Sequence, residues 1–299
     1  MWDAIVNRQT GFLNFTPELN AAMRDTVVAA VGTGGNGVVM DHLVRIGFQR
    51  FILVDPDVVE DTNLNRLPFT TAEIGMPKVR AWERHLKAVN PGCHVEAHQH
   101  AVCRHDGPWL TEVLSGAELA FLGTTDLEAN LVVSRVCAGL GLRMIVGPAS
   151  SGAYVVSTFT HDNDITFEKV ADYGTEHLEL TDIDYSSLVP KFQALSFYPG
   201  RKRKLDPRAR RDMLAGRLSA RSCKIFVSLT NAAMAFEAVK NVAFLRGMPL
   251  EGAGIVAMPV FHIFDPYSGC AYYYHILKRE IGIPDWLTGE VRWRPYAGD

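Results

Sequence analysis

Four glycines follow a short apolar run and have the spacing of a loop that holds phosphate groups. Val27–Val31 leads directly into Gly32, Gly34 and Gly37, with Gly35 between the last two. In such a motif the first glycine permits a sharp turn and the second lets the backbone approach phosphates. The third lets a helix and a strand pack closely. The free N–H groups at the start of the following helix then favour a bound anion.

An acidic residue stands where a nucleotide ribose would be held. A second apolar run, Phe51–Val54, ends on Asp55, 23 residues after Gly32. In glycine-loop folds, an acid about 20 residues beyond the first glycine bonds the ribose hydroxyls. Asp57 is a second candidate for this contact, although its position also suits a plain turn residue. These features agree equally well with NAD and with a nucleoside triphosphate.

An amide and two cations follow the acid, and NAD gives no reason for them. They are Asn63, Arg66 and Lys78. Positive charge at this place would neutralise a triphosphate and would stabilise the charge that builds up on a reacting phosphate. The alternative is that Arg66 and Lys78 are ordinary solvated surface charges.

A further carboxylate follows the fourth apolar run of the chain. Thr125 and Asp126 follow Leu119–Gly123, which reads as a strand, with one residue in between. Parallel sheets bind ligands at the carboxyl ends of their strands, so Asp126 is a candidate ligand for Mg²⁺. The alternative role is an N-cap of the next helix, and the two roles are compatible.

The chain around these residues alternates between strand-like and helix-like segments. Strands are expected at 27–31, 51–55, 94–98, 119–123 and 144–147, and helices at 35–46, 77–89, 107–115 and 127–140. Nearly all-apolar strands separated by helices indicate a parallel sheet that is covered on both faces. The predicted class is therefore α/β, a doubly wound Rossmann-like sheet that is mostly parallel.

The second half of the chain follows a different pattern. We expect a strand at 153–160, a long helix at 224–244, and two strands near 255–264 and 271–277 that form a C-terminal antiparallel extension. Residues 162–221 look irregular and include basic runs at 201–204 and 208–211, so we interpret them as an insertion on the substrate side. Residues 1–24 are interpreted as an N-terminal arm, 25–299 as one domain, and the tail from Gly282 as a surface wrap.

Composition narrows the class of protein further. The formal net charge is −3, which gives no indication of a general nucleic-acid or anionic-membrane binder. No apolar run is long enough to span a membrane, and no signal-like start is visible, so we expect a cytoplasmic protein. The five cysteines contain no Cys-x-x-Cys pair, so no structural zinc is expected; they are Cys93, Cys103, Cys137, Cys223 and Cys270.

Taken in order, these motifs resemble the ThiF/MoeB/HesA family, the bacterial relatives of ubiquitin-activating enzymes. The matching pieces are Gly32–Gly37, Asp55–Asp57, Asn63–Arg66, Gly75–Lys78 and Thr125–Asn130, with weaker matches at Asn7–Gln9, Glu237–Lys240 and Phe264–Gly269. The set spans about residues 5 to 279 and is weak between 160 and 222. An ordered set of this kind is much more specific than any one motif.

The resemblance implies an enzyme that binds ATP and Mg²⁺ and activates a carboxylate as an acyl-adenylate. By family position, Asp55 would hold the ribose, and Asn63, Arg66 and Lys78 would contact phosphates. Asp126 would bind Mg²⁺ or organise the groups around the α-phosphate. The family position of Arg8 is that of an arginine finger supplied by the partner subunit of a homodimer.

Two departures from the family pattern limit the chemistry that is expected. The zinc-binding Cys-x-x-Cys pairs are missing, and Cys223 is closer to the late helix than a thioester-forming cysteine of the family would be. We therefore expect adenylation without a thioester, on a peptide or small-protein carboxylate, with a sulfur carrier or a carboxylate on tRNA as alternatives. An NAD(P)-dependent oxidoreductase and a non-catalytic binding module are the competing classes.

Overall fold

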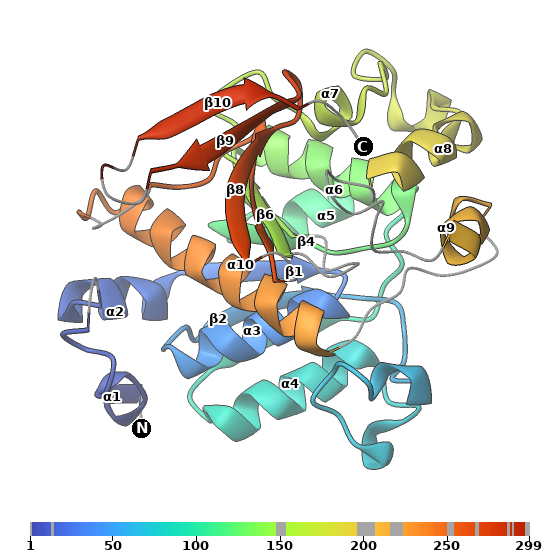
Figure 1. Ribbon diagram of the computed structural model, residues 1–299. Coiled ribbons are helices and arrows are strands. Elements are labelled where there is room, and N and C mark those ends of the chain that lie inside the picture. Colours follow the sequence, from blue (N-terminus) through green and yellow to red (C-terminus); the bar gives the residue numbers. More distant parts are fainter. Residues whose placement is uncertain are drawn as a thin grey trace.

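Ten strands form one sheet in the part of the chain that the structure describes. This computed structural model describes residues 2–12, 15–147, 154–195, 207–215, 224–249, 254–266, 269–285, 288 and 290–296. The strand order is β10-β9-β8-β7-β6-β5-β4-β1-β2-β3 (Figure 1). The strands are β1 (Val27–Val31), β2 (Arg50–Val54), β3 (His94–His98), β4 (Leu119–Leu122), β5 (Arg143–Val146), β6 (Tyr154–Phe159), β7 (Val260–Asp265), β8 (Cys270–His275), β9 (Glu280–Pro284) and β10 (Val291–Pro295).

The two halves of the sheet differ in strand direction. Strands β3, β2, β1, β4 and β5 are parallel neighbours, and each pair from β5 to β10 is antiparallel. The predicted fold class, a doubly wound Rossmann-like sheet with a C-terminal antiparallel extension, is confirmed. The five strands expected in the first half are also confirmed, each within one residue of its expected bounds.

Both faces of the parallel strands are buried, which explains why they are almost entirely apolar. Along β1, Val28 and Ala30 pack in one core cluster, whereas Ala29 and Val31 pack in a second cluster on the opposite face. Successive side chains of a strand point to opposite faces, so an apolar run can supply both cores.

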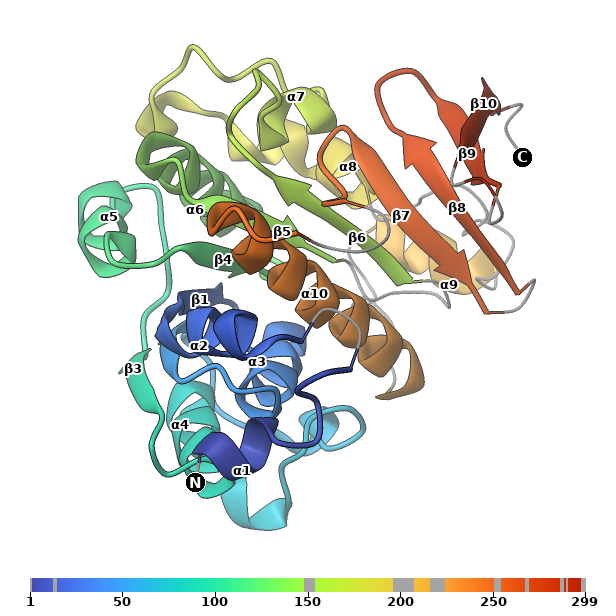
Figure 2. The same ribbon diagram turned by 90° about the vertical axis from the view of Figure 1, so that its left-hand side faces the viewer.

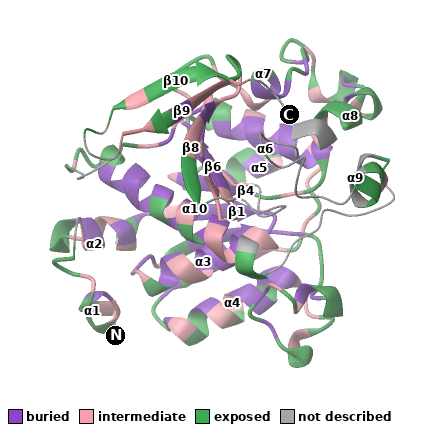
Figure 3. Cartoon of the chain, viewed as in Figure 1, coloured by how far each residue is buried: buried purple, intermediate pink, exposed green. Residues whose placement is uncertain are grey.

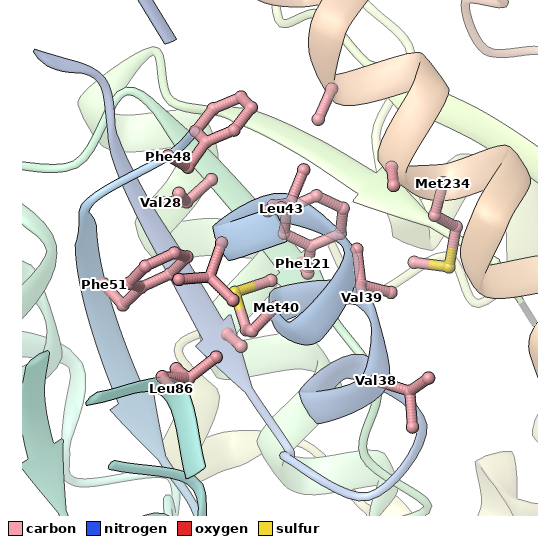
Figure 4. Close-up of a cluster of buried hydrophobic side chains, with 14 of the residues drawn as sticks. Val28, Val38, Val39, Met40, Leu43, Phe48, Phe51, Leu86, Phe121 and Met234 are labelled. Atoms are coloured by element: carbon pink, nitrogen blue, oxygen red, sulfur yellow. The ribbon is translucent and has the colours of Figure 1, made fainter. Parts of the chain in front are cut away.

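One face is covered by four helices: α2 (Pro17–Asp25), α3 (Gly35–Arg45), α4 (Lys78–Val89) and α10 (Lys224–Leu245). Helix α10 lies beside α3 and crosses the sheet (Figures 1 and 2). Figure 4 shows Met40 and Leu43 of α3 between the strand residues Phe51 and Phe121, with Met234 of α10 close by. These side chains belong to a continuous core that fixes the start of α3 relative to β1.

The N-terminal arm is packed onto this face. Helix α1 (Trp2–Val6) is tied down by the Trp2 indole, which donates to the Gly47 carbonyl at 2.8 Å. Helix α2 contributes Leu19 and Met23 to the main core. Thr16 caps α2 by accepting a hydrogen bond from the Leu19 N–H.

The opposite face carries α5 (Gly107–Leu114) and α6 (Leu127–Leu140), followed by the expected insertion. The expectation that residues 162–221 are irregular is wrong for the described part, which contains α7 (Phe167–Ala171), α8 (Tyr185–Leu195), α9 (Pro207–Leu214) and a short 3-10 turn. Arg135 of α6 anchors this region through two bonds to the Glu168 carboxylate, of 3.1 and 2.7 Å. Figure 3 shows α6 buried and α8 mostly exposed. The basic run 201–204 lies outside the described residues.

The tail does not wrap the surface as expected, because it adds two strands to the sheet. In the pairing of β9 with β10, Trp293 lies opposite Gly282. A Cβ on Gly282 would be 3.1 Å from two atoms of the Trp293 ring, so glycine makes room for the indole. Trp293 therefore serves cross-strand packing.

Candidate nucleotide site

The glycine loop lies at the point where the strand order of the parallel sheet reverses, between β1 and β4. Strands β1 and β4 are neighbours, and the helices that follow them cover opposite faces. Gly32, directly after β1, has φ +83°, and a Cβ there would be 2.6 Å from the Gly123 carbonyl oxygen after β4. Ligands of doubly wound sheets bind in the crevice that forms at this switch point.

The glycines of the loop have different surroundings. A Cβ on Gly34 or Gly35 would meet no described atom within 4 Å, so the backbone before α3 faces open space. A phosphate can therefore approach the first N–H groups of α3 closely. Gly37 was expected to allow helix–strand packing, but a Cβ there would be 2.0 Å from the Trp82 indole of α4. The third glycine thus lets two helices approach each other.

Asp55 is tied to the glycine loop. Its carboxylate is only 4% exposed, and Oδ2 accepts hydrogen bonds from the Thr33 N–H at 2.5 Å and the Thr33 hydroxyl at 2.9 Å. Oδ1 accepts from the Asp57 N–H at 2.9 Å. A carboxylate has roughly four acceptor positions. Described residues fill three of them, so one position stays open to a further hydrogen-bond donor.

Asp57 and Lys78 form an ion pair beside this acid. Lys78 Nζ lies 2.7 Å from Asp57 Oδ2, and the Lys78 N–H donates to the Asp57 carbonyl at 2.9 Å. Lys78 is the first residue of α4. Its ammonium therefore stands at a helix N-terminus, where the macrodipole adds to its positive charge.

The amide and the other cation shape the loop between Asp57 and Lys78. The Asn63 side chain is buried and accepts from the Glu60 N–H at 3.2 Å, closing a capping box around a 3-10 turn, Asp61–Asn63. Arg66 is half-buried, and its Nη1 donates to the Thr62 carbonyl at 2.9 Å. Described residues accept hydrogen bonds only from Nη1 of Arg66. The Nε and Nη2 atoms therefore keep three N–H groups that could donate to a phosphate. The phosphate contact of Asn63 stays a prediction.

Asp126 and Thr125 are exposed after β4. Asp126 Oδ1 accepts from the Ala129 N–H at 2.8 Å and caps α6, which confirms the N-cap role. No group of three metal-binding side chains occurs among the described residues. Mg²⁺ commonly uses one or two carboxylates and takes its other ligands from phosphates and water. One exposed carboxylate at the crevice fits that ligand set.

Four residues of this site carried no distinct signal in the sequence: Thr33, Asn36, Trp82 and Asn231. The Asn231 amide of α10 donates to the Gly35 carbonyl at 2.9 Å. Asn36 is 3% exposed, lies against Gly123, and its Nδ2 has no hydrogen-bond partner among the described residues. An asparagine inside the glycine motif is the one clue that could have been followed.

Arg8 lies away from the glycine loop of its own chain. It is exposed, and the next residue, Gln9, donates to the Ile46 carbonyl at 2.8 Å. Ile46 follows the last residue of α3, whereas the loop precedes the first. The 11 residues of α3 separate these ends by about 16 Å. The structure therefore does not bring Arg8 together with the other predicted site residues.

The described cysteines and histidines form no second reactive centre. Cys93 and Cys137 are buried, and burial raises the pKa of the Cys137 thiol to about 12. Cys223 lies outside the described residues. Of the histidines on β3 and in the loop that follows it, His98 contacts Glu96 at 2.7 Å and His100 contacts Asp106 at 3.1 Å. No described helix is both long and apolar enough to cross a membrane.

A glycine loop at the switch point and an acid directly after β2 place the chain among the doubly wound α/β proteins, and Arg66 and Lys78 add two cations to its candidate nucleotide site. The model of the ThiF family matches residues 6–243, and the chain belongs to this family. The resemblance drawn from the motifs is thereby confirmed.

Curated relatives match somewhat less than half of the chain. Ubiquitin-like modifier-activating enzyme 5 of Drosophila ananassae is 36% identical over 143 residues, which are 44% of this chain and 36% of that protein. The corresponding enzyme of Rattus norvegicus is 30% identical over 141 residues, 44% of this chain and 35% of its own. The matched stretch thus spans about a third of the relatives' length.

Solved structures share the fold over more of the chain. The E. coli MccB structure with ATP has a TM-score of 0.62 at 15% identity, covering 86% of this chain and 66% of MccB. The PaaA structure has a TM-score of 0.61 at 16% identity, with the same coverage. At these identities the likeness establishes the fold.

Proposed function

We propose that this protein is an ATP-dependent adenylyltransferase that activates the carboxylate of a peptide or small protein. The observation that carries the proposal is the open space in front of Gly34 and Gly35 at the start of α3, between Asp55 and Asp126. Family membership and the sequence likeness to ubiquitin-like modifier-activating enzymes support it.

The chain's own groups fit the parts of ATP. Asp55 keeps one acceptor position for a ribose hydroxyl. The first N–H groups of α3 are available to a phosphate near the loop. Arg66 and Lys78, in the segment that follows, supply positive charge for the remaining phosphates.

The proposed reaction joins a carboxylate to AMP. A carboxylate oxygen of the substrate attacks the α-phosphorus, the bond from that phosphorus to the bridging oxygen breaks, and pyrophosphate leaves. The products are the acyl-adenylate and pyrophosphate, and no oxidant or reductant is needed. Arg66 and Lys78 offset the charge that accumulates on the phosphates in the transition state. Asp126 would hold Mg²⁺, which would supply positive charge that offsets part of the charge on the phosphates.

We infer that the protein acts as a homodimer in which Arg8 completes the partner subunit's site. Arg8 is exposed and separated from its own glycine loop by the length of α3. An arginine that completes the site of another copy would have this placement.

The solved structures of MccB suggest a class of substrate. The structural neighbour MccB has been solved with MccA and with N-formylated MccA. A peptide carboxylate is therefore our first choice, with a sulfur-carrier protein or a tRNA-borne carboxylate as alternatives. We propose that the reaction stops at the adenylate or passes it to a nucleophile of the substrate, without a thioester on Cys223.

Calorimetry with the full chain tests nucleotide binding. We expect titration with Mg²⁺ and ATP to release or absorb heat. We expect NADH to bind much more weakly than ATP. Pyrophosphate release with candidate peptides then tests the chemistry, and Arg66→Ala or Asp126→Ala should remove most of it while Cys223→Ala leaves it. Tight NADH binding without ATP binding would overturn the proposal and favour an oxidoreductase.

A further inference from the structure

The segment from Asp57 to Lys78 is a closed loop with a paired base. Val59 donates its N–H to the Met76 carbonyl at 2.8 Å, and Gly75 donates to the Val59 carbonyl at 2.9 Å. Val58 and Pro77 form an antiparallel bridge next to these bonds, on the side toward Asp57 and Lys78. Because the two backbone segments are held together, Asp57 and Lys78 face each other at the base of the loop.

The ion pair at this base joins a nearly buried cation to an exposed acid. The Asp57 side chain is 62% exposed, whereas that of Lys78 is 10% exposed. The carboxylate supplies the counter-charge that a nearly buried ammonium needs. Backbone bonds already close the loop, so loop closure gives no reason for a carboxylate at position 57.

The position of the pair relative to the glycine loop does give a reason. Asp57 donates its N–H to Asp55, and Asp55 in turn accepts two bonds from Thr33 of the glycine loop. Trp82, on the same helix as Lys78, donates to the Thr33 carbonyl at 2.8 Å. The Lys78 ammonium is therefore connected to the glycine loop by two routes, one through Asp57 and one through α4.

We infer that Asp57 is a positioning residue that orients the Lys78 ammonium toward the phosphates of the nucleotide. An ammonium has three N–H donors on a flexible stem. Asp57 accepts one of them at 2.7 Å, so the other two are held in a defined direction. This role deepens the proposed function and rests on it, because it requires a bound triphosphate.

Calorimetry on the full-length protein tests the inference with two ligands. Asp57→Asn keeps the size of the side chain and removes its charge. We expect it to weaken Mg²⁺–ATP binding by about tenfold, the size of one charge-assisted hydrogen bond. Adenosine, which has no phosphates, should bind both proteins equally. Asp61→Asn is the matched control. Asp61 is an exposed acid of the same loop, and its Oδ1 accepts a hydrogen bond from the neighbouring Thr62 N–H.

A double-mutant cycle separates positioning from a general effect of charge. In a Lys78→Ala background, Asp57→Asn should cause no further loss of ATP affinity, because the oriented group is gone. Equal or tighter ATP binding by Asp57→Asn would overturn the inference, and so would a full additional loss in the double mutant. Failure of the unmodified protein to bind ATP would instead reject the proposed function. Urea unfolding of each variant shows that the fold is intact.

Discussion

The indole N–H of Trp82 donates to the carbonyl oxygen of Thr33 across 2.8 Å, joining α4 to the glycine loop. The indole is fully buried, and it fills the space that a side chain at Gly37 would need. The helix that begins with Lys78 is thus fixed to the loop that would receive phosphates. The relative position of the two cannot change without breaking this contact.

Replacing Trp82 by phenylalanine should therefore affect both stability and binding. The variant keeps an apolar ring and leaves the buried Thr33 carbonyl without its donor, which costs about 1–3 kcal/mol. We expect a lower free energy of unfolding in urea and a several-fold weaker ATP affinity. Trp109→Phe is the control, since the Trp109 indole donates no hydrogen bond to a described residue. Unchanged ATP affinity in Trp82→Phe would argue against a fixed loop.

The glycines should separate folding from binding. Gly34→Ala adds a methyl group in open space, so the free energy of unfolding should change by less than about 0.5 kcal/mol. The same methyl group would obstruct a phosphate, so ATP affinity should fall by about tenfold or more.

Gly37→Ala, in contrast, should lower the stability of the protein. Its methyl group would overlap the Trp82 ring and cost roughly 1–3 kcal/mol of stability. Thermal unfolding and ATP titration of the two glycine variants check both expectations. If Gly34→Ala bound ATP normally, the proposed approach of the phosphate to this loop would be wrong.

The insertion should depend on Arg135. This residue bonds the Glu168 carboxylate twice and donates to the Leu178 carbonyl at 2.6 Å, and Glu168 is only 4% exposed. Arg135→Met would leave a buried carboxylate unpaired, at a cost of about 3–5 kcal/mol.

We expect Arg135→Met to unfold at lower urea concentration and to be cleaved faster between residues 162 and 195 in limited proteolysis. Arg84→Met is the control, because Arg84 is 64% exposed and its nearest acid, Glu73, is 3.6 Å away. Cleavage of the two variants at equal rates would show that Arg135 does not hold the insertion.

Asp41 should make stability depend on acid pH. Burial disfavours its carboxylate, but hydrogen bonds from His85 and Arg45 outweigh that effect and lower its pKa from 3.8 to about 2. Between these values the native protein binds fewer protons than the unfolded chain, so this contribution is present above about pH 4 and is lost toward pH 2. The shift corresponds to roughly 2 kcal/mol.

Asp41→Asn should therefore lose roughly 2 kcal/mol in urea unfolding at neutral pH, and the difference should shrink near pH 3. Asp25→Asn removes an exposed acid that pairs with the adjacent Arg24 and should cost less than about 1 kcal/mol. A difference that stays constant from neutral to acid pH would contradict the assignment.

Arg8 should act on the partner subunit if the proposed homodimer exists. Arg8→Ala and Asp126→Ala should each abolish pyrophosphate release alone, because every site lacks one group. Mixed dimers would contain one site with both defects and one site with neither, so up to about half of the activity of the sites in those dimers should return. No recovery after subunit exchange would place Arg8 outside the partner's site.

Much of the fold follows from local sequence patterns. Apolar runs such as Val27–Val31 have the length and composition of buried strands, and the glycine motif marks the turn into α3. These signals act within a few residues, so they predict elements and their order. The predicted tail and the predicted irregular insertion were wrong for the described residues, because β10 and the described helices of the insertion depend on partners distant in sequence.

Contacts between distant residues decided the rest of the site. Lys78 reaches Asp57 from 21 residues away, and Trp82 reaches Thr33 from 49 residues away. The order of the motifs in the sequence predicted that Asp55 and Lys78 belong to one site. Which donor occupies each carboxylate oxygen depends on side-chain packing, and packing is a property of the folded chain as a whole.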